Sequence, residues 1–396
     1  MSEVVREEII FEILDADVPW FTLLEDGTRD RNNIEHVSIG IRYVRKGKVF
    51  ESLVNVATTL SSDAKTMANL TMEILRNNGL DSKRLLSQCY DGASVMSGRK
   101  GGVQTLIQEE LHRKVPYVHC FNHRLHLVIM KLISEVPELK IFFDQCRMLH
   151  LFLNHVKVIS IYTGTRIGRL LEQRWSGHLK ITEAIYSNYQ TIIELLRTVQ
   201  CSTEFSGEQV VQSADAFSGI VSEAKSILLH DDDMSRPIRR KKPNCLYNDY
   251  ILTESTTKEH DTLESLFIDT IHITSREFER RFFENNMLLQ AVDSIEEFDI
   301  DKLYPLSELG ISLPSIEELS VVKEFMKDKT NILEELYKYR QPFNNTYNLF
   351  ATVAMFCCST SMCESSFSVL TRVSRPQRNM SEIRCSNLVF LAFESR

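Results

Sequence analysis

Three acidic residues, far apart in the sequence, stand where expected elements begin or end. Asp26 closes a strand-like segment, Asp91 closes a second one, and Glu364 opens a helical pattern near the C-terminus. Neighbouring strand ends meet at one edge of an open sheet, so their side chains share a crevice. A late helix packed on that sheet would add the third carboxylate. Clustered carboxylates suit two-metal phosphoryl transfer, in which divalent ions about 3.5–4 Å apart bridge the scissile phosphate.

The same three residues also have ordinary structural explanations. Asp26-Gly27 and Asp91-Gly92 are both typical of turns that follow strands. Glu364 fits an acid in the first turn of a helix, where it interacts favourably with the helix dipole. The spacing alone leaves both interpretations open.

The elements around these residues predict a mixed sheet. Residues 37–43 alternate between apolar and polar types, which predicts a half-buried strand. A helix is expected from Ala64, capped by Ser62 or Asp63. The expected strands are 21–26, 37–43, 49–56, 85–90 and 115–120, the other early helices are 103–111 and 124–133, and the apolar run 349–358 is a last strand-like segment. The order β-β-β-α-β-α-β-α predicts an α/β fold with a ribonuclease-H-like mixed sheet flanked by helices.

The middle of the chain has a different pattern. Helical spacing dominates residues 138–200, 261–298 and 317–339. Between them, an acidic triplet (231–233) precedes the basic run Arg236–Lys242, which predicts an exposed loop. That run fits a nuclear localisation signal or a phosphate-contacting loop, and equally a solvated loop whose charges balance.

Composition narrows the classes of protein to which this chain can belong. The chain has 396 residues, of which 43% are hydrophobic and 25% charged, as in an ordinary globular protein. The net charge of −8 argues against coating nucleic acid by bulk charge but leaves room for a local basic groove. Nine cysteines lack framework spacing, and neither a signal peptide nor an apolar run of roughly 18 residues is present. We expect a reduced intracellular protein without membrane contact.

Four blocks of sequence carry a family resemblance. They are LEDGTRD (24–30) running into residues 41–48, YDGASVMSG (90–98), HCFNHRLHL (119–127) followed by RWS (174–176), and CESSFS (363–368) continuing to Arg384. In this order they resemble hAT-superfamily transposases, especially the domesticated vertebrate relatives that carry an MYM-type, BED-type or TTF-type zinc finger. The matches cover residues 20–200 and 340–396 and are weaker between them.

The resemblance implies a ribonuclease-H-like core interrupted by an all-α insertion domain. Asp26, Asp91 and Glu364 match the family's Asp-Asp-Glu triad, which binds two Mg²⁺ or Mn²⁺ ions and drives cleavage and strand transfer of DNA. Asp30 is an alternative for the first aspartate of the triad, and we prefer Asp26 because it closes the expected strand. The implied parts are an N-terminal remnant helix (1–20), the core (21–180), the helical insertion (181–335), and the rest of the core with the dimerisation region (336–396).

Four further residues match the family's motifs. Trp175 matches a tryptophan that stacks on a flipped base, and Arg174 precedes it; the alternative for Trp175 is helix packing. Cys120 and His123 match a Cys-x-x-His pair beside the catalytic centre. With His126 they also resemble part of a zinc site, but a second ligand pair is missing, so we expect no structural zinc.

The sequence also departs from the family. Active members carry a DNA-binding zinc finger before the first strand, and residues 1–20 contain no such finger. We therefore expect a truncated or domesticated copy, or one isoform of a longer protein, located in the nucleus and also possible in the cytoplasm. The residues expected to hold a homodimer or higher homo-oligomer are Phe367, Leu370, Leu388 and Leu391. The alternative function is a non-enzymatic dimerisation or scaffold module.

Overall fold

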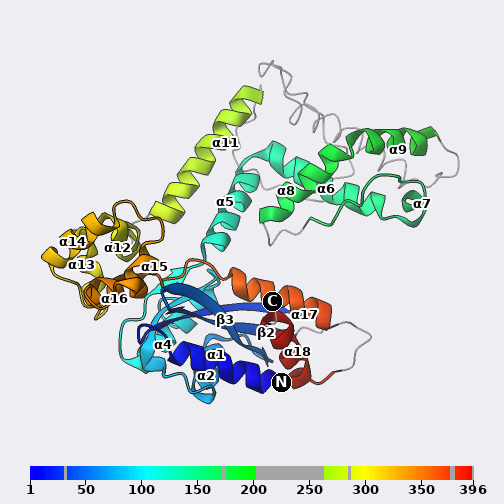
Figure 1. The fold of residues 1–396 in the computed structure, drawn as a ribbon. Helices are drawn as coiled ribbons and strands as arrows, with labels where there is room; N and C mark the ends of the chain where they lie inside the picture. The colour runs from blue at the N-terminus through cyan, green and yellow to red at the C-terminus, as the bar shows by residue number, and fades with distance from the viewer. Residues whose placement is uncertain (31–33, 171–174, 202–262, 284–286, 375–379, 395–396) are drawn as a thin grey trace. The chain divides into compact units, whose positions relative to one another are not determined.

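The computed structural model describes residues 1–30, 34–170, 175–201, 263–283, 287–374 and 380–394 (Figure 1). The chain splits into two compact units. The sheet unit comprises Met1–Arg124 and Asn285–Arg396, and the helical unit comprises Leu125–Glu284. The domain boundaries expected at residues 180 and 335 stay predictions.

A five-stranded mixed sheet forms the centre of the sheet unit. Its strands lie in the order β3-β2-β1-β4-β5. β1 is antiparallel to β2, β2 is antiparallel to β3, and β4 is parallel to both β1 and β5. The strands are β1 (Phe21–Arg29), β2 (Glu35–Arg45), β3 (Lys48–Thr59), β4 (Leu85–Tyr90) and β5 (Tyr117–His119). This arrangement, with its flanking helices, confirms the expected α/β ribonuclease-H-like fold.

The first strand is longer than expected. Local signals predict that it ends before Gly27, but Gly27 pairs with Val37 and the ladder continues to Arg29 and Glu35. The Arg29 guanidinium also binds the Glu35 carboxylate at 2.8 Å across the ladder. Asp26 therefore lies inside β1, and its predicted place at the strand end was wrong.

The turn after β1 belongs to Asp30 instead. Its Oδ1 accepts a hydrogen bond from the Ile34 N–H (3.0 Å), and its own N–H donates to the Ile34 carbonyl (3.0 Å). An aspartate that bonds the backbone ahead of it is a frequent turn former.

Helices cover both faces of the sheet. One face carries Glu25 and is covered by α1 (Ser2–Leu14), α2 (Ala64–Asn77) and α4 (Val103–Leu111), whose residues Glu12, Thr71 and Gln104 bond to the strands. The opposite face, which carries Asp26, is covered by α17 (Ser361–Val373). Because both faces are covered, β2 is buried on both sides, and the predicted half-buried strand was wrong in this respect.

The C-terminal helix closes an edge of the sheet. α18 (Glu382–Glu394) lies along the edge strand β3, next to α1 (Figure 1). Glu394 Oε1 accepts from the Leu53 N–H at 2.6 Å, and Ser386 Oγ donates to the Val56 carbonyl at 2.6 Å. These side chains satisfy backbone groups that an open edge strand would leave available for another chain.

The apolar run before Glu364 is not a strand. Residues 349–353 end helix α16, and residues 354–360 connect it irregularly to α17. Leu349 and Ala351 are fully buried among neighbouring helices, which explains an apolar run without a strand. The remaining helices of the sheet unit are α3 (Ser94–Ser97), α12 (Met287–Asp293), α13 (Ile300–Ser307), α14 (Ile316–Met326), α15 (Ile332–Lys338) and α16 (Asn344–Val353), with short turns η1 (Ser82–Arg84) and η5 (Ser294–Glu297).

The helical unit has its own apolar core. Its elements are α5 (Phe121–Glu135, which begins in the sheet unit), α6 (Pro137–Leu153), α7 (Val156–Ile159), α8 (Trp175–Ser187), α9 (Tyr189–Cys201), α11 (Leu263–Phe278) and the π-helical turn η4 (Glu279–Phe283). Leu149, Ile185 and Ile192 are fully buried within it. Among the described helices of the whole chain, none has the length and apolar character to cross a membrane.

The contact between Gly40 and Met362 fixes how closely α17 approaches the sheet. A Cβ added to Gly40 would lie 1.7 Å from Met362 Cε. We predict that Gly40→Ala lowers the free energy of unfolding by about 1–3 kcal/mol, the usual cost of overpacking. Urea unfolding followed by fluorescence measures it. A Trp175→Phe background leaves Trp20, in the sheet unit, as the single tryptophan.

Two further variants test whether the contact with Met362 causes this loss of stability. Gly101→Ala adds the same methyl group where no atom lies within 4 Å, so stability should barely change. In the double variant Gly40→Ala/Met362→Ala, the loss should be smaller than the sum of the two single losses. Additive losses would show that Met362 is not what Gly40 accommodates.

Candidate active site

Asp26, Asp91 and Glu364 come from three separate elements of the sheet unit. Asp26 lies in β1, Asp91 directly follows β4, and Glu364 lies in the first turn of α17. β1 and β4 are parallel neighbours, with Leu24 opposite Cys89, so the chain brings Asp26 and Asp91 to the same end of the sheet. Each of the three carboxylates is partly exposed.

The charges of these residues act on one another. Burial, and then the negative charges of Glu364 and Asp91, raise the pKa of Asp26 to about 8. One hydrogen bond from the Gly27 N–H to Asp26 Oδ1 (2.9 Å) opposes this effect. Like charges disfavour the ionised form of a carboxyl group only when they lie close to it. The three carboxylates therefore form one electrostatic cluster, in which Asp26 keeps its proton at neutral pH.

Helix α17 is held directly over Asp26. Ser38 is the β2 partner of Asp26, and its Oγ accepts a hydrogen bond from Ser366 Oγ at 2.9 Å. Ser366 is fully buried, and it follows Glu364 by two positions on the same helix. With the Met362 contact on Gly40, this bond sets the position from which Glu364 approaches the sheet.

Asp91 is held by the loop that follows β4. Its Oδ1 accepts from the Ala93 N–H at 3.1 Å, while Tyr117 Oη donates to the Asp91 carbonyl at 2.6 Å. The imidazole of His119 lies against Gly92, where an added Cβ would come within 2.3 Å of the ring. The His119 ring therefore packs closely against the backbone at Gly92.

Cys120 and His123 lie where β5 passes into α5. Cys120 is buried, and its Sγ accepts a hydrogen bond from the Thr360 N–H at 3.4 Å, one residue before α17. The rings of His123 and His119 are 5.3 Å apart. Cys120 therefore contacts the segment that leads to Glu364, whereas His123 packs against His119 of β5.

The three carboxylates are donors of the kind that hard divalent cations prefer. Among the described residues, no group of three or more His, Cys, Asp or Glu side chains is arranged around one metal position. A pair of ions held by Asp26, Asp91 and Glu364 would therefore require these side chains to move closer together. Mg²⁺ and Mn²⁺ prefer carboxylate oxygens, and a cation would oppose the effects of burial and of the neighbouring negative charges that raise the pKa of Asp26. Asp26, Asp91 and Glu364 would be the residues that hold them.

Glu25 is a further acidic residue near the site that sequence reasoning missed. It is fully buried on the opposite face of β1, where its Oε2 accepts from Thr71 Oγ1 at 2.8 Å and its Oε1 has no hydrogen-bond partner. Burial raises its pKa to about 8, and the charge of Asp91 adds to the effect. The alternation of side chains along the strand was the available sequence signal, because it places Glu25 on the face of β1 opposite to Asp26.

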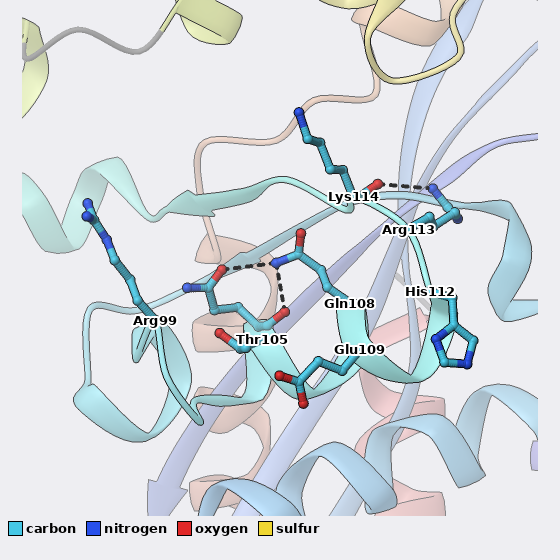
Figure 2. Close-up of a pocket in the computed structure, with 8 residues that line it drawn as sticks. Arg99, Thr105, Gln108, Glu109, His112, Arg113 and Lys114 are labelled. Atoms are coloured by element: carbon cyan, nitrogen blue, oxygen red, sulfur yellow. Dashed lines mark hydrogen bonds between the residues drawn. The ribbon is translucent and has the colours of Figure 1, made fainter.

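A shallow hollow with a basic rim lies beside α4. Its volume is about 470 Å³, and Arg99, Arg113 and Lys114 contribute three cationic side chains, against one acid, Glu109 (Figure 2). Arg113 is engaged in the fold, where it bonds the Lys83 carbonyl at 3.0 Å and covers the Trp20 ring. Arg99 and Lys114 are exposed, and Lys114 forms an ion pair with Glu308 at 3.4 Å.

The other expected residues divide into three groups. Arg174 and the basic run 236–242 lie outside the described residues, as does the side chain of Trp175. Phe367 and Leu370 are buried in the core of the sheet unit itself. Leu388 and Leu391 line a surface groove between α1 and α18, together with Met1, Val5 and Ala392.

One comparison with known proteins bears on these observations. Residues 1–102 match the model of a family described as ZMYM1/FAM200, RNase-like domain (DUF4371). The matched part contains β1 to β4 and therefore both Asp26 and Asp91. The match agrees with the ribonuclease-like sheet and fits the expected resemblance to the transposase-derived region of MYM-type proteins.

The buried carboxyl of Glu25 makes the stability of the protein depend on pH. Between about pH 4.5 and pH 8 the folded protein keeps a proton that the unfolded chain releases. Rising pH therefore favours unfolding in this window, by about 1.4 kcal/mol per pH unit for one such group. We predict that Glu25→Gln removes this contribution, measured by urea unfolding between pH 5 and 8.

Glu8→Gln provides the matched control, because Glu8 is exposed on α1. This variant should keep the pH dependence of the wild type. Identical slopes for the wild type and Glu25→Gln would contradict a protonated Glu25 in the folded protein.

Proposed function

We propose that this chain is a transposase-derived protein whose sheet unit carries a two-metal phosphodiester cleavage and strand-transfer site of the hAT type, acting on DNA in the nucleus. The observation that carries the proposal is the pKa of Asp26, which the charges of Glu364 and Asp91 raise further after burial. The influence of Glu364 and Asp91 on the pKa of Asp26 is an electrostatic interaction among three carboxylates that are far apart in the sequence. The ribonuclease-like family match over residues 1–102 supports the same class of chemistry.

Each carboxylate has a distinct part in the proposal. Bound Mg²⁺ or Mn²⁺ would supply activation of the attacking hydroxyl and stabilisation of the leaving oxygen. Asp26 would hold a cation in its ionised form, after loss of the proton that its raised pKa favours. Asp91 contributes from the end of β4. Glu364 contributes from α17, which the Ser366–Ser38 bond holds against the sheet.

Asp91→Asn tests the proposed catalysis. The change removes one anionic ligand and keeps the side-chain shape. We predict that Mn²⁺-dependent cleavage of nicked or hairpin duplex DNA falls by at least the roughly 10–100-fold that loss of an outer-shell partner costs a metal site. Gel analysis of end-labelled DNA measures the rate.

The control is Asp328→Asn, since Asp328 is exposed after α14. It should leave the rate unchanged. Equal rates for Asp91→Asn and wild type would remove Asp91 from the mechanism. Equal unfolding curves for the two variants exclude misfolding as the cause of a loss.

The basic hollow beside α4 supports DNA as the substrate. Arg99 belongs to the connection that leaves Asp91 for α4, so the hollow begins in the same segment as a proposed metal ligand. Its exposed cations suit the phosphate backbone, which is bound by charge and without sequence information. Because α4 covers the Glu25 face of the sheet, we propose that DNA flanking the cleavage position follows a path along α4 on that face.

The double variant Arg99→Ala/Lys114→Ala tests this path. We predict weaker duplex binding and a shallower salt dependence, with the slope of log K against log salt reduced by about 0.9 for each phosphate that the protein no longer neutralises. Fluorescence anisotropy at several salt concentrations measures both. Lys329→Ala removes an exposed lysine elsewhere and should leave the slope unchanged. An unchanged slope in the double variant would count against the path.

The groove between α1 and α18 favours a second candidate function, self-association. It measures about 420 Å³, and Leu388 and Leu391 line it. Ile383, on the same C-terminal helix, is 76% exposed. We propose that a second copy of this chain covers this surface. Buried Phe367 and Leu370 would then support the helices from within and not touch the partner.

Leu388→Asp is the corresponding test. A carboxylate in an apolar contact should shift the protein toward monomer in sedimentation velocity. Leu60→Asp makes the same change at a residue that is 97% exposed after β3, and it should not alter the oligomer. The same sedimentation coefficient for wild type and Leu388→Asp would contradict a contact through this groove.

A further inference from the structure

An exposed apolar surface lies on the helical unit where α6 ends and α7 begins. Leu151, in the last turn of α6, is 65% exposed, and Val156, the first residue of α7, is 81% exposed. Ile159 and Ile161 are exposed as well, while Val158 between them is fully buried. Single exposed apolar residues are ordinary on a protein surface, whereas a group of neighbouring ones marks an interaction site.

A loop with two exposed arginines passes beside the same part of α6. Residues 162–170 form neither helix nor strand. The His150 ring of α6 donates a hydrogen bond to the Ile167 carbonyl at 3.0 Å, which places the loop next to the end of that helix. Ile167 is buried in the apolar core of the helical unit, whereas Arg166 and Arg169 of the same loop are exposed.

Hydrogen bonds fix the conformation of this loop. Asn188, a buried residue between α8 and α9, accepts a hydrogen bond from the Thr165 N–H at 2.8 Å and donates one to Thr165 Oγ1 at 2.6 Å. Tyr162 Oη donates to the Thr165 carbonyl at 3.1 Å, and Leu170 is buried where the loop ends. Because the backbone is fixed in advance, less conformational entropy is lost when the arginines bind a partner.

The cations of this surface are not balanced by acids close to them in the sequence. Residues 145–171 contain no Asp or Glu, and the exposed cations among them include Lys157, Arg166 and Arg169. Neither Arg166 nor Arg169 forms an ion pair with a carboxylate in the part of the chain that the structure describes. A guanidinium group binds a carboxylate through two parallel hydrogen bonds, so each arginine suits an acidic side chain of a partner.

The mixture of aliphatic and cationic side chains favours a protein partner over a nucleic acid. Phosphates bind to cationic and polar groups, and unpaired bases stack on exposed aromatic rings. The most exposed apolar residues here, Leu151 and Val156, are aliphatic, and Tyr162 uses its hydroxyl within the loop. Aliphatic surface is removed from water most favourably by other apolar side chains, which a protein partner supplies.

We propose that this surface binds an acidic amphipathic helix of a partner protein. Apolar side chains on one side of that helix would cover the exposed aliphatic residues, and Asp or Glu residues beside them would pair with the arginines. The surface lies wholly within the helical unit, so the proposal is independent of catalysis by the sheet unit. The residues of this surface, named the α6–α7 face, are Leu151, Val156, Ile159, Ile161, Arg166 and Arg169.

Fluorescence anisotropy with the full-length protein tests the proposal. The probe is a fluorescein-labelled peptide of about 18 residues, long enough to form a helix, with Leu at helical spacing and Glu and Gln elsewhere. One control peptide has Lys in place of Glu, and another has Ser in place of Leu. We expect only the Glu/Leu peptide to bind, and we expect its affinity to fall as added salt screens the charges.

Charge reversal assigns the binding to the arginines. Arg166→Glu/Arg169→Glu should raise the Kd of the Glu/Leu peptide at least about tenfold, because two attractive contacts become repulsive. The matched control is Arg76→Glu/Arg384→Glu, which makes the same change of net charge at two exposed arginines of the sheet unit. It should leave the Kd unchanged.

A second pair of variants tests the apolar contacts. Val156→Ser/Ile159→Ser should also weaken binding of the peptide, and both positions are exposed, so the fold should tolerate the change. Ile316→Ser/Val321→Ser makes the same change at two exposed residues of α14 and should bind the peptide as the wild type does. Unfolding curves that match the wild type exclude misfolding as the cause of a loss.

Three results would overturn the proposal. The first is no binding of the Glu/Leu peptide to the wild type, or equal binding to Arg166→Glu/Arg169→Glu. The second is a duplex DNA probe that binds in place of the peptide and is lost in that variant, which would assign the arginines to nucleic acid. The third is a lower sedimentation coefficient for Val156→Ser/Ile159→Ser than for the wild type, which would assign the face to a second copy of this chain.

Discussion

The repulsion among carboxylates around Asp26 is the constraint on which the rest of the sheet unit depends. Burial raises the pKa of Asp26, and the negative charges of Glu364 in α17 and Asp91 after β4 raise it further. Such a cluster is unfavourable without a proton or a cation to reduce its charge. In the protein without bound metal, protonation of Asp26 reduces this negative charge. In the proposed chemistry, a pair of divalent cations would reduce it instead.

The fold holds the cluster together by covering both faces of one sheet. On the Asp26 face, α17 approaches closely because β2 presents Gly40 to Met362 and Ser38 to Ser366. On the other face, α2 covers Glu25, a second carboxyl that stays protonated in the core. The Cys120 thiol, after β5, accepts a hydrogen bond from the Thr360 N–H and so contacts the segment that leads into α17.

Local sequence signals predicted the five strands of the sheet, but not the full length of β1 or the burial of β2 on both faces. The five strands, the Asp63 cap of α2 and the end of β4 at Tyr90 follow from periodicity and turn residues. The extension of β1 past Gly27 depends on pairing with Glu35, and the helical residues 349–353 depend on packing, so neither is visible locally. Motif order selected Asp26, Asp91 and Glu364, whereas the burial of Glu25 beside them required the folded arrangement.

Proton release on Mn²⁺ binding tests the central claim most directly. Isothermal titration calorimetry at pH 7, in buffers of different ionisation enthalpy, gives the number of protons released. If the three carboxylates hold the ions, binding should release about one proton, since Asp26 is protonated in the free protein. Asp26→Asn should bind more weakly and release none. Mn²⁺ binding without proton release, or unchanged binding by Asp26→Asn, would contradict a site built on Asp26.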